Sequence, residues 1–407
     1  MNNWYLLAAI PVFGICVLIH ELGHFLTAKW AGIRVEEFGL GLPPRLVGFR
    51  KRESGGWEVI WFGGPRNAED SYGHNKQSPF SGASGGVSLP STVPAEQHHT
   101  IYSLNLLPIG GFVRMPGENG DANDEEGNYD PASFAAKSAG KRIIVLVAGV
   151  TMNVILAMFL FMFAYGAGQP VTPPEIRSVA AGSPAAAAGL RAGDTFISLN
   201  GQSVQHFDDV VTITNNLLNQ HRNASTVPIA VVARHAGRQE TFATTVNARV
   251  NPPKGQGAMG IVATDKVTFV RYPFWEAPYR GIGETFSVTG QFLTGIEQMI
   301  TGAIKPQIVG PAGITQITGQ VAQSVPTLGW WPILSLTAIL NINLAIVNIL
   351  PFPALDGGRV FLILVELLRG GKRLKPEVEG FINLAGMAIL LTLMVIITVS
   401  DVMHWNG

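Results

Sequence analysis

Long apolar runs alternate with polar segments along the chain, and four of these runs contain no Lys, Arg, Asp or Glu. They cover residues 4–19, 143–168, about 325–355 and 381–400, and the first continues past a polar break to residue 28. A helix that spans a bilayer needs about 20 apolar residues. The pattern therefore predicts four transmembrane helices, with buried helices of a soluble core as the alternative.

The basic residues that flank these runs predict the orientation of the chain. Lys and Arg concentrate in short loops that stay in the cytoplasm. Here they stand after the first run, just before the second, and between the third and the fourth. We therefore expect residues 30–142 and 356–380 in the cytoplasm, and both termini and residues 169–324 outside. The first run is not expected to be a signal peptide, because no basic segment precedes Trp4.

A segment of alternating apolar and polar residues follows the second run. Strands are expected at residues 195–199, 227–234 and 240–246, and a helix at 208–219. Asn200-Gly201 between strand-like runs predicts a tight turn. The run from Ser183 to Val204, SPAAAAGLRAGDTFISLNGQSV, resembles PDZ domains of bacterial proteases. Such domains bind a chain end or extended peptide at a sheet edge. A generic β-rich domain is the alternative.

The remaining polar segments are less regular. Residues 52–100 are rich in Gly, Ser, Pro and His and predict a long loop, with a strand at 57–62. Its expected partner is residues 102–115, broken at Pro108–Gly111, and residues 118–130 predict an acidic loop. Residues 273–305 carry few charges and five aromatic side chains. They predict an amphipathic helix at the membrane surface or, equally, one packed against the β-rich domain.

Composition supports a membrane protein with soluble parts. The 407 residues include only 14% charged ones, against about 25% in an average soluble domain, and the mean hydropathy is +0.26. The net charge of zero argues against a nucleic-acid partner, which would require a basic excess. The single cysteine, Cys16, excludes an internal disulfide and a Cys-rich zinc finger.

The first apolar run contains the sequence His20-Glu21-Leu22-Gly23-His24. Residues four apart lie on one face of a helix, so His20 and His24 can bind one Zn²⁺ together. Glu21 is then the candidate general base for hydrolysis. Polar and charged residues inside a span are costly and indicate function. The alternative is a polar patch at the end of a helix.

A catalytic zinc site needs a third protein ligand and an open position. Asp356 lies at the end of the third run, after Pro351 and Pro353. The two prolines are expected to break the helix, and irregular backbone is tolerated in a membrane where protein or water covers it. The break would deliver Asp356 sideways toward the histidines. The alternative is a helix end with an exposed aspartate.

HELGH in the first span and Asn348-x-x-Pro-x-Pro-x-Leu-Asp-Gly in the third together resemble the site-2 protease family of intramembrane zinc metalloproteases, of the bacterial regulator-of-sigma-E type. Residues 38–46, 108–115 and 309–314 add to this resemblance. It implies one Zn²⁺ per chain, held by His20, His24 and Asp356, with Glu21 as the base. It also implies Asn348, Gly110, Gly111, Pro351 and Pro353 at the substrate, with Gly110-Gly111 as the turn of a membrane-facing β-hairpin.

The expected fold is an α-helical polytopic membrane protein with four transmembrane helices, a cytoplasmic membrane-associated β-hairpin and an extracytoplasmic β-rich PDZ domain. The expected transmembrane segments are a first helix at 1–30, a second at 143–168, a third with its cytoplasmic loop at 325–380, and a fourth at 381–400. Between them we expect a cytoplasmic loop at 31–142 with an insertion near 63–100, the PDZ domain at 173–250, and a linker with an amphipathic part at 251–324.

The resemblance implies a protease of the bacterial plasma membrane, with its site near the cytoplasmic face. Its expected partners are the bilayer, a peptide or chain end at the PDZ domain, and single-span substrates such as anti-sigma factors or signal-peptide remnants. The family's best-known members have two PDZ domains, and this chain has room for one. Two alternatives remain. A CAAX-processing or HtpX-like zinc protease usually has Glu as the third ligand. A metal-binding transporter or scaffold would tolerate replacement of Glu21.

Overall fold

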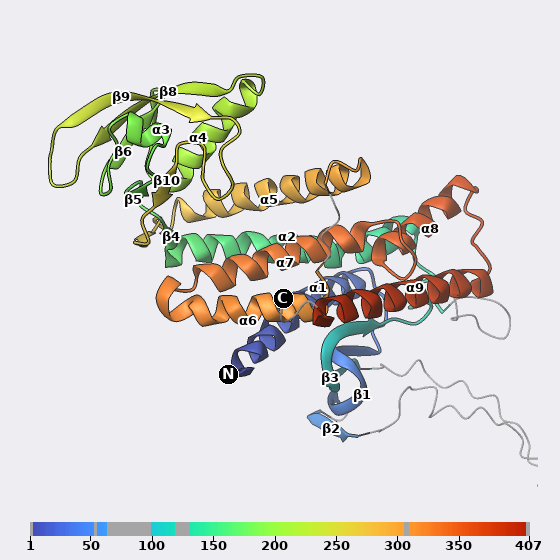
Figure 1. The fold of residues 1–407 in the computed structure, drawn as a ribbon. Coiled ribbons are helices and arrows are strands. Elements are labelled where there is room, and N and C mark those ends of the chain that lie inside the picture. Colours follow the sequence, from blue (N-terminus) through green and yellow to red (C-terminus); the bar gives the residue numbers. More distant parts are fainter. Residues whose placement is uncertain (1–2, 53–54, 63–98, 119–129, 305–308, 404–407) are drawn as a thin grey trace, which may run out of the picture. The chain divides into compact units, whose positions relative to one another are not determined.

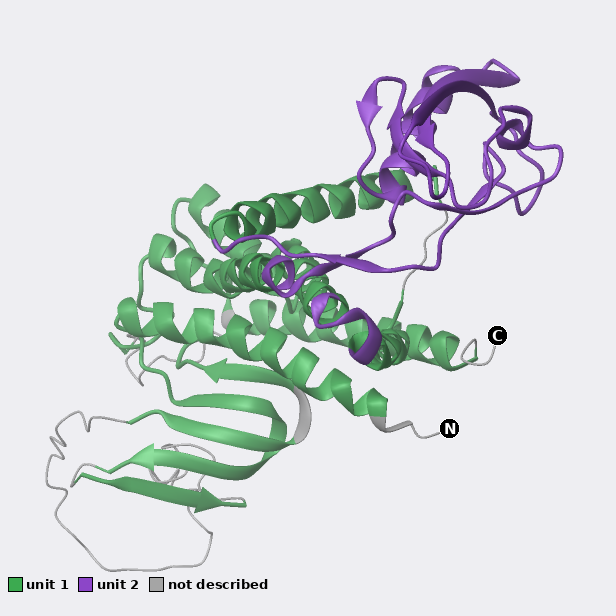
Figure 2. Ribbon diagram, turned by 90° about the vertical axis from the view of Figure 1, so that its left-hand side faces the viewer, with its two compact units in different colours: residues 1–163, 275–325, 332–407 green, residues 164–274, 326–331 purple. Residues whose placement is uncertain are grey.

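The computed structural model describes residues 3–52, 55–62, 99–118, 130–304 and 309–403. The chain forms two compact units (Figure 2). Unit 1 comprises residues 1–163, 275–325 and 332–407, and unit 2 comprises residues 164–274 and 326–331. The expected insertion near residues 63–100 and the expected acidic loop at 118–130 lie almost wholly outside the described residues.

Within the described residues, four helices are long and apolar enough to cross a membrane, as the sequence predicts (Figure 1). They are α1 (Ala9–Trp30, after the 3-10 helix η1, Asn3–Ala8), α2 (Ala139–Ala167), α7 (Trp331–Ile349) and α9 (Pro376–Met403). Their apolar surface is largely uncovered by protein, and only 6% of the most apolar segment of α9 is buried. Such surface suits a helix whose solvent is lipid.

The third apolar run, at about residues 325–355, is divided among more than one helix. Helix α6 (Pro311–Leu328) ends just before Gly329, which has a φ of +68°, and α7 begins at Trp331. Helix α7 then ends at Ile349. Six residues, which include Pro351 and Pro353, separate it from α8 (Asp356–Leu368). Prolines lack the donor that a continuing helix requires. The predicted break is therefore present.

The sheet of unit 1 contains β1 (Glu37–Lys51), β2 (Trp57–Trp61) and β3 (Ile101–Arg114), in the order β2-β1-β3. The expected pairing of residues 57–62 with 102–115 is wrong, because β2 pairs with β1 instead. Gly55 and Gly56, both with positive φ, directly precede β2 and allow it to turn back on β1. The pattern of a strand identifies its buried face but not its neighbour.

Strand β3 reverses direction within its own length. Residues 37–40 of β1 pair with residues 101–104 on one side and with residues 111–114 on the other. The reversal therefore falls between these two halves, where Gly110 has a φ of +81°. The two halves flank the start of β1 and do not form a simple hairpin with each other.

An apolar cluster at one end of the unit 1 helices joins the elements that carry the site. Its members include Ala28 of α1, Val113 of β3, Val145 of α2 and Ile363 of α8, all buried. Burial of such side chains contributes roughly 25 cal/mol per Å² of apolar surface. The cluster therefore ties α1, α2, α8 and the sheet to one another.

Unit 2 is built on a four-stranded sheet in the order β7-β6-β8-β9. Its strands are β6 (Thr195–Leu199), β7 (Gln202–Ser203), β8 (Thr226–Arg234) and β9 (Thr241–Arg249), and its helices are α3 (Pro184–Ala187) and α4 (Phe207–Gln220). Two smaller sheets pair β5 (Ile176–Val179) with β10 (Ile261–Ala263) and β4 (Gln169–Val171) with β11 (Thr268–Val270). The strands and the helix expected from sequence are present within a few residues.

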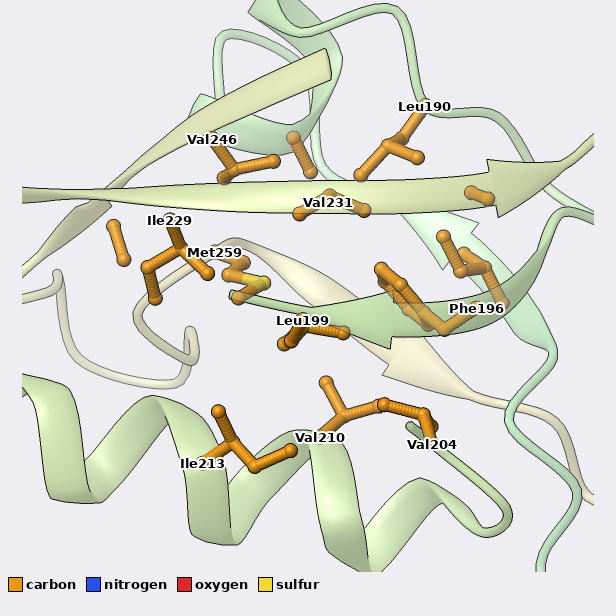
Figure 3. Close-up of a cluster of buried hydrophobic side chains, with 14 residues drawn as sticks. Leu190, Phe196, Leu199, Val204, Val210, Ile213, Ile229, Val231, Val246 and Met259 are labelled. Carbon is orange, nitrogen blue, oxygen red and sulfur yellow. The ribbon is translucent and has the colours of Figure 1, made fainter. Parts of the chain in front are cut away.

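A single apolar core fills unit 2, as Figure 3 shows with 14 buried side chains. Phe196 and Leu199 of β6 pack there with Val231 of β8 and with Val210 and Ile213 of α4. The three-residue spacing of Val210 and Ile213 places both on one face of α4. On β6, Phe196 and Leu199 both reach the core because the pairing with β8 shifts register between Phe196 and Ser198. Asn200 and Gly201, with φ of 50° and 80°, form the predicted turn after β6.

Helix α5 (Ala277–Ile300) occupies most of the segment predicted to be amphipathic. It belongs to unit 1, where its Val288 and Phe292 pack against Ala157 and Phe161 of α2. Its helical partner is therefore a spanning helix. Tyr279 and Phe286 stay exposed, so an association of this face with lipid remains a prediction.

Candidate metal site

His20 and His24 lie one turn apart on α1, and both are buried. Their ring centroids are 4.8 Å apart and their Nε2 atoms 3.2 Å apart. Gly23 makes this burial possible, since a Cβ at residue 23 would stand 2.5 Å from the carbonyl oxygen of Ala148. Helix α2 therefore packs directly against the turn of α1 that carries both imidazoles.

Asp356 reaches the histidines from the first residue of α8. The turn before it is tight, with Ala354 at a φ of +72°. Gly357 and Gly358 follow, and a Cβ on either glycine would collide with carbonyl groups of the segment from Ile349 to Phe352. Only glycine fits this close approach. The sequence LDGG after the two prolines thus folds the chain back and aims the carboxylate inward.

The two nitrogen atoms and the carboxylate oxygen lie close together. Asp356 Oδ2 lies 3.1 Å from His20 Nε2 and 3.3 Å from His24 Nε2. Ligands bonded to a tetrahedral Zn²⁺ at about 2.0–2.1 Å are about 3.3 Å apart. The three separations therefore match three corners of a zinc site, and two imidazoles with a carboxylate are a suitable donor set.

The charge of Asp356 also suits a metal ligand. The ordinary pKa of an aspartate carboxyl group is about 3.9, and Asp356 Oδ2 lies within hydrogen-bond distance of both imidazoles. The group is therefore a carboxylate at neutral pH, the form that binds a cation.

Helix α2 makes contacts to both imidazoles that the sequence did not predict. His24 Nδ1 donates to the carbonyl oxygen of Val145 at 2.8 Å. The side-chain amide of Asn153 lies 3.3 Å from His20 Nδ1. Gly149 faces both rings. The signal that could have revealed this face is a lone asparagine in an apolar span, four residues after a glycine.

The remaining predicted residues take different places. Asn348 Nδ2 lies 3.3 Å from His20 Nε2, at the end of α7. Gly111 lies against α1, where an added Cβ would stand 3.1 Å from Glu21 Cγ. The structure therefore places Asn348 beside His20 and Gly111 beside Glu21.

Three other predicted residues lie at turns near the site. Gly110 stands at the reversal of β3, beside the side chain of Leu42. Pro351 is exposed, and Pro353 packs against Gly386 of α9. Their contact with substrate stays a prediction.

These features define a class of protein: a membrane protein in which two imidazoles and the carboxylate of Asp356 form a site suited to a divalent metal ion. The model of Peptidase family M50 matches residues 8–79 and 85–393. The chain belongs to peptidase family M50, the site-2 protease family. It is an integral membrane protein and an intramembrane zinc metalloprotease.

Curated relatives match almost the whole chain. A protein of Clostridium acetobutylicum named as a zinc metalloprotease is 29% identical over 413 residues, which cover 99% of both chains. Zinc metalloprotease RasP of Oceanobacillus iheyensis is 30% identical, over 97% of this chain and 98% of its own. Regulator of sigma-W protease RasP of Bacillus subtilis is 26% identical, over 97% of each chain.

Proposed function

We propose that this protease hydrolyses peptide bonds within the transmembrane segments of single-span membrane proteins. In this proposal His20, His24 and Asp356 bind one Zn²⁺, and Glu21 is the general base. The observation that carries the proposal is the spacing of the three ligand atoms, 3.1–3.3 Å, at a turn of a spanning helix. A hydrolytic site at this depth is suited to a substrate that is itself in the membrane.

The side chains around the cluster have different roles in the proposed hydrolysis. A zinc ion bound there would act as a Lewis acid and lower the pKa of a water molecule toward about 7. Glu21 takes a proton from the attacking water and passes it to the leaving amine. Asn348, whose Nδ2 lies beside His20, donates a hydrogen bond to the carbonyl oxygen of the scissile bond or to the substrate backbone.

The second half of β3 offers a place for an extended substrate. Residues 111–114 pair with residues 37–40 on one side. No strand in the described part of the chain pairs with their other side. A transmembrane helix hides its carbonyl groups in hydrogen bonds of its own, so it must unwind before cleavage. An edge strand stabilises the extended form by pairing with it, and Gly111 brings this edge to Glu21.

We propose further that unit 2 is a single PDZ domain outside the cytoplasm that recruits or excludes substrates. Its support is the element order, in which α3, β6, the Asn200-Gly201 turn, α4 and β8 follow the PDZ-like sequence. The orientation rests on the basic loops, which put residues 30–142 and 356–380 in the cytoplasm of a bacterial cell.

The name of the Bacillus subtilis relative concerns sigma-W. An anti-sigma factor is accordingly a candidate substrate, as is a signal-peptide remnant.

The test is cleavage of a single-span protein by the purified chain in detergent, with zinc content measured in parallel. Glu21→Gln keeps the shape of the side chain and removes the base. We expect zinc in both proteins and a loss of cleavage by roughly 10²-fold or more. Glu297→Gln, an exposed change on α5, is the control and should cleave normally.

Two results would contradict the proposal. Full activity of Glu21→Gln would remove Glu21 as the general base of this mechanism. Unchanged zinc content after Asp356→Ala would remove the third ligand and favour the CAAX-processing or HtpX-like alternative, which uses a glutamate.

A further inference from the structure

One face of α2 forms the wall behind both imidazoles. Val145, Gly149 and Asn153 are spaced by four residues, so they lie in one line along the helix. Val145 accepts a hydrogen bond from His24 through its backbone carbonyl, and Gly149 leaves space for both rings. Asn153 alone meets an imidazole, that of His20, with a polar side chain.

Asn153 is fully buried in the spanning part of α2. Its Oδ1 atom has no hydrogen-bond partner among the described residues. An unpaired polar group in such a place costs about 1–3 kcal/mol. Leucine would fill nearly the same volume without this cost, so the amide requires a reason that packing does not supply.

The hydrogen-bonding needs of His20 supply that reason. A neutral imidazole that binds a metal through Nε2 carries its proton on Nδ1, and this N–H requires an acceptor. An asparagine amide has the same shape in two orientations that exchange Oδ1 and Nδ2. Of these, only the one with Oδ1 toward His20 provides an acceptor, at the 3.3 Å position that the amide already occupies.

We propose that Asn153 is a positioning residue of the zinc site. Its side-chain oxygen accepts the Nδ1–H of His20 and so holds Nε2 toward the metal. His24 receives the same support from the carbonyl of Val145, which no side-chain substitution removes. The inference rests on the proposed role of His20 as a ligand. The inference also predicts that the affinity for zinc depends on residue 153, which does not follow from the role of His20 alone.

The experiment measures the zinc dissociation constant of the full chain in detergent, by competition with a chelator of known affinity. Asn153→Leu removes the acceptor, and we expect about 10- to 100-fold weaker binding. Asn153→Asp keeps an acceptor in the same place and should bind zinc at least as tightly as the wild type. A purely structural role would not produce this difference between leucine and aspartate.

Asn341→Leu is the matched control. Asn341 is also a fully buried asparagine in a spanning helix, and its Oδ1 likewise has no partner among the described residues. Its Nδ2, however, donates to Thr337 O at 2.8 Å and to Cys16 Sγ at 3.1 Å and not to an imidazole. Its loss should leave the zinc dissociation constant unchanged. Thermal unfolding of the metal-free proteins checks that each variant is folded.

Two outcomes overturn the inference alone: wild-type affinity in Asn153→Leu, or tenfold weaker binding in Asn153→Asp. If Asn153→Leu does not fold, the zinc affinity of Asn153→Asp alone tests the inference. A different outcome overturns the proposed function as well, namely a wild-type chain that binds no zinc or binds it equally well after His20→Ala.

Discussion

Gly149 of α2 lies so close to His24 of α1 that a Cβ atom at residue 149 would stand 2.5 Å from the Nε2 atom. The same Cβ would lie 2.8 Å from His20 Cε1. The space beside both ring nitrogens thus exists because residue 149 has no side chain. A metal ion on these nitrogens and a methyl group on residue 149 would compete for neighbouring positions.

Gly149→Ala is therefore expected to weaken zinc binding about tenfold or more, because overpacking costs about 1–3 kcal/mol. Chelator competition measures the effect. Gly166→Ala on the same helix is the control, since nothing lies within 4 Å of its added Cβ. Equal zinc affinity in both variants would show that the rings can move away from residue 149 at little cost.

Gly111→Ala should reduce cleavage and leave the zinc content unchanged. The added Cβ would stand 2.9 Å from Val17 Cγ1 and 3.1 Å from Glu21 Cγ, so it displaces the edge strand or the proposed base but not the ligands. Assays of cleavage and of bound zinc on the same preparation separate the two effects. Loss of zinc from this variant would contradict the expectation.

Asn348→Ala is expected to lower kcat by about 10²-fold with a smaller effect on KM, because the amide would act mainly on developing charge. Steady-state kinetics on a soluble-tagged single-span substrate resolves the two constants. Asn343→Ala, on the same helix, serves as the comparison. A change confined to KM would assign Asn348 to substrate binding instead.

Glu366 of α8 and Arg142 of α2 form an ion pair at 2.7 Å, and only 12% of the Glu366 side chain is exposed. Burial raises the pKa of Glu366, but the hydrogen bond and charge of Arg142, with the charge of Arg373, bring it below the ordinary 4.5. A lowered folded-state pKa means that the pair contributes fully above pH 4.5. This contribution is lost as the pH falls through the lower value.

Glu366→Gln should therefore reduce the free energy of unfolding by about 2 kcal/mol at pH 7, and the difference from wild type should shrink below pH 4.5. Unfolding at a series of pH values measures this. Glu58→Gln breaks a more exposed pair with Arg50 and should cost less than about 1 kcal/mol. A constant difference across all pH values would contradict the linkage.

The parts of the site that sequence could predict are those fixed by chemistry and short spacing. His20 and His24 share a helix face, and the prolines before Asp356 indicate a turn. Asn153 could not be tied to His20, because no local spacing links them: 133 residues separate the two. The pairing of β2 was wrong for a related reason, since alternation does not specify a partner strand.

The ligand cluster has a consequence for how the protein is made. His20 and Asn348 are 328 residues apart, and Asp356 comes later still. At roughly 5–20 residues per second, the ribosome completes α1 and α2 about 10 to 40 s before it supplies the carboxylate. During that interval His20, His24 and Asn153 can already meet, but Asp356, the proposed third ligand, has not yet been synthesised. If the proposed ligands are right, a nascent protease is inert toward the membrane proteins inserted beside it and becomes competent only when its synthesis is nearly finished.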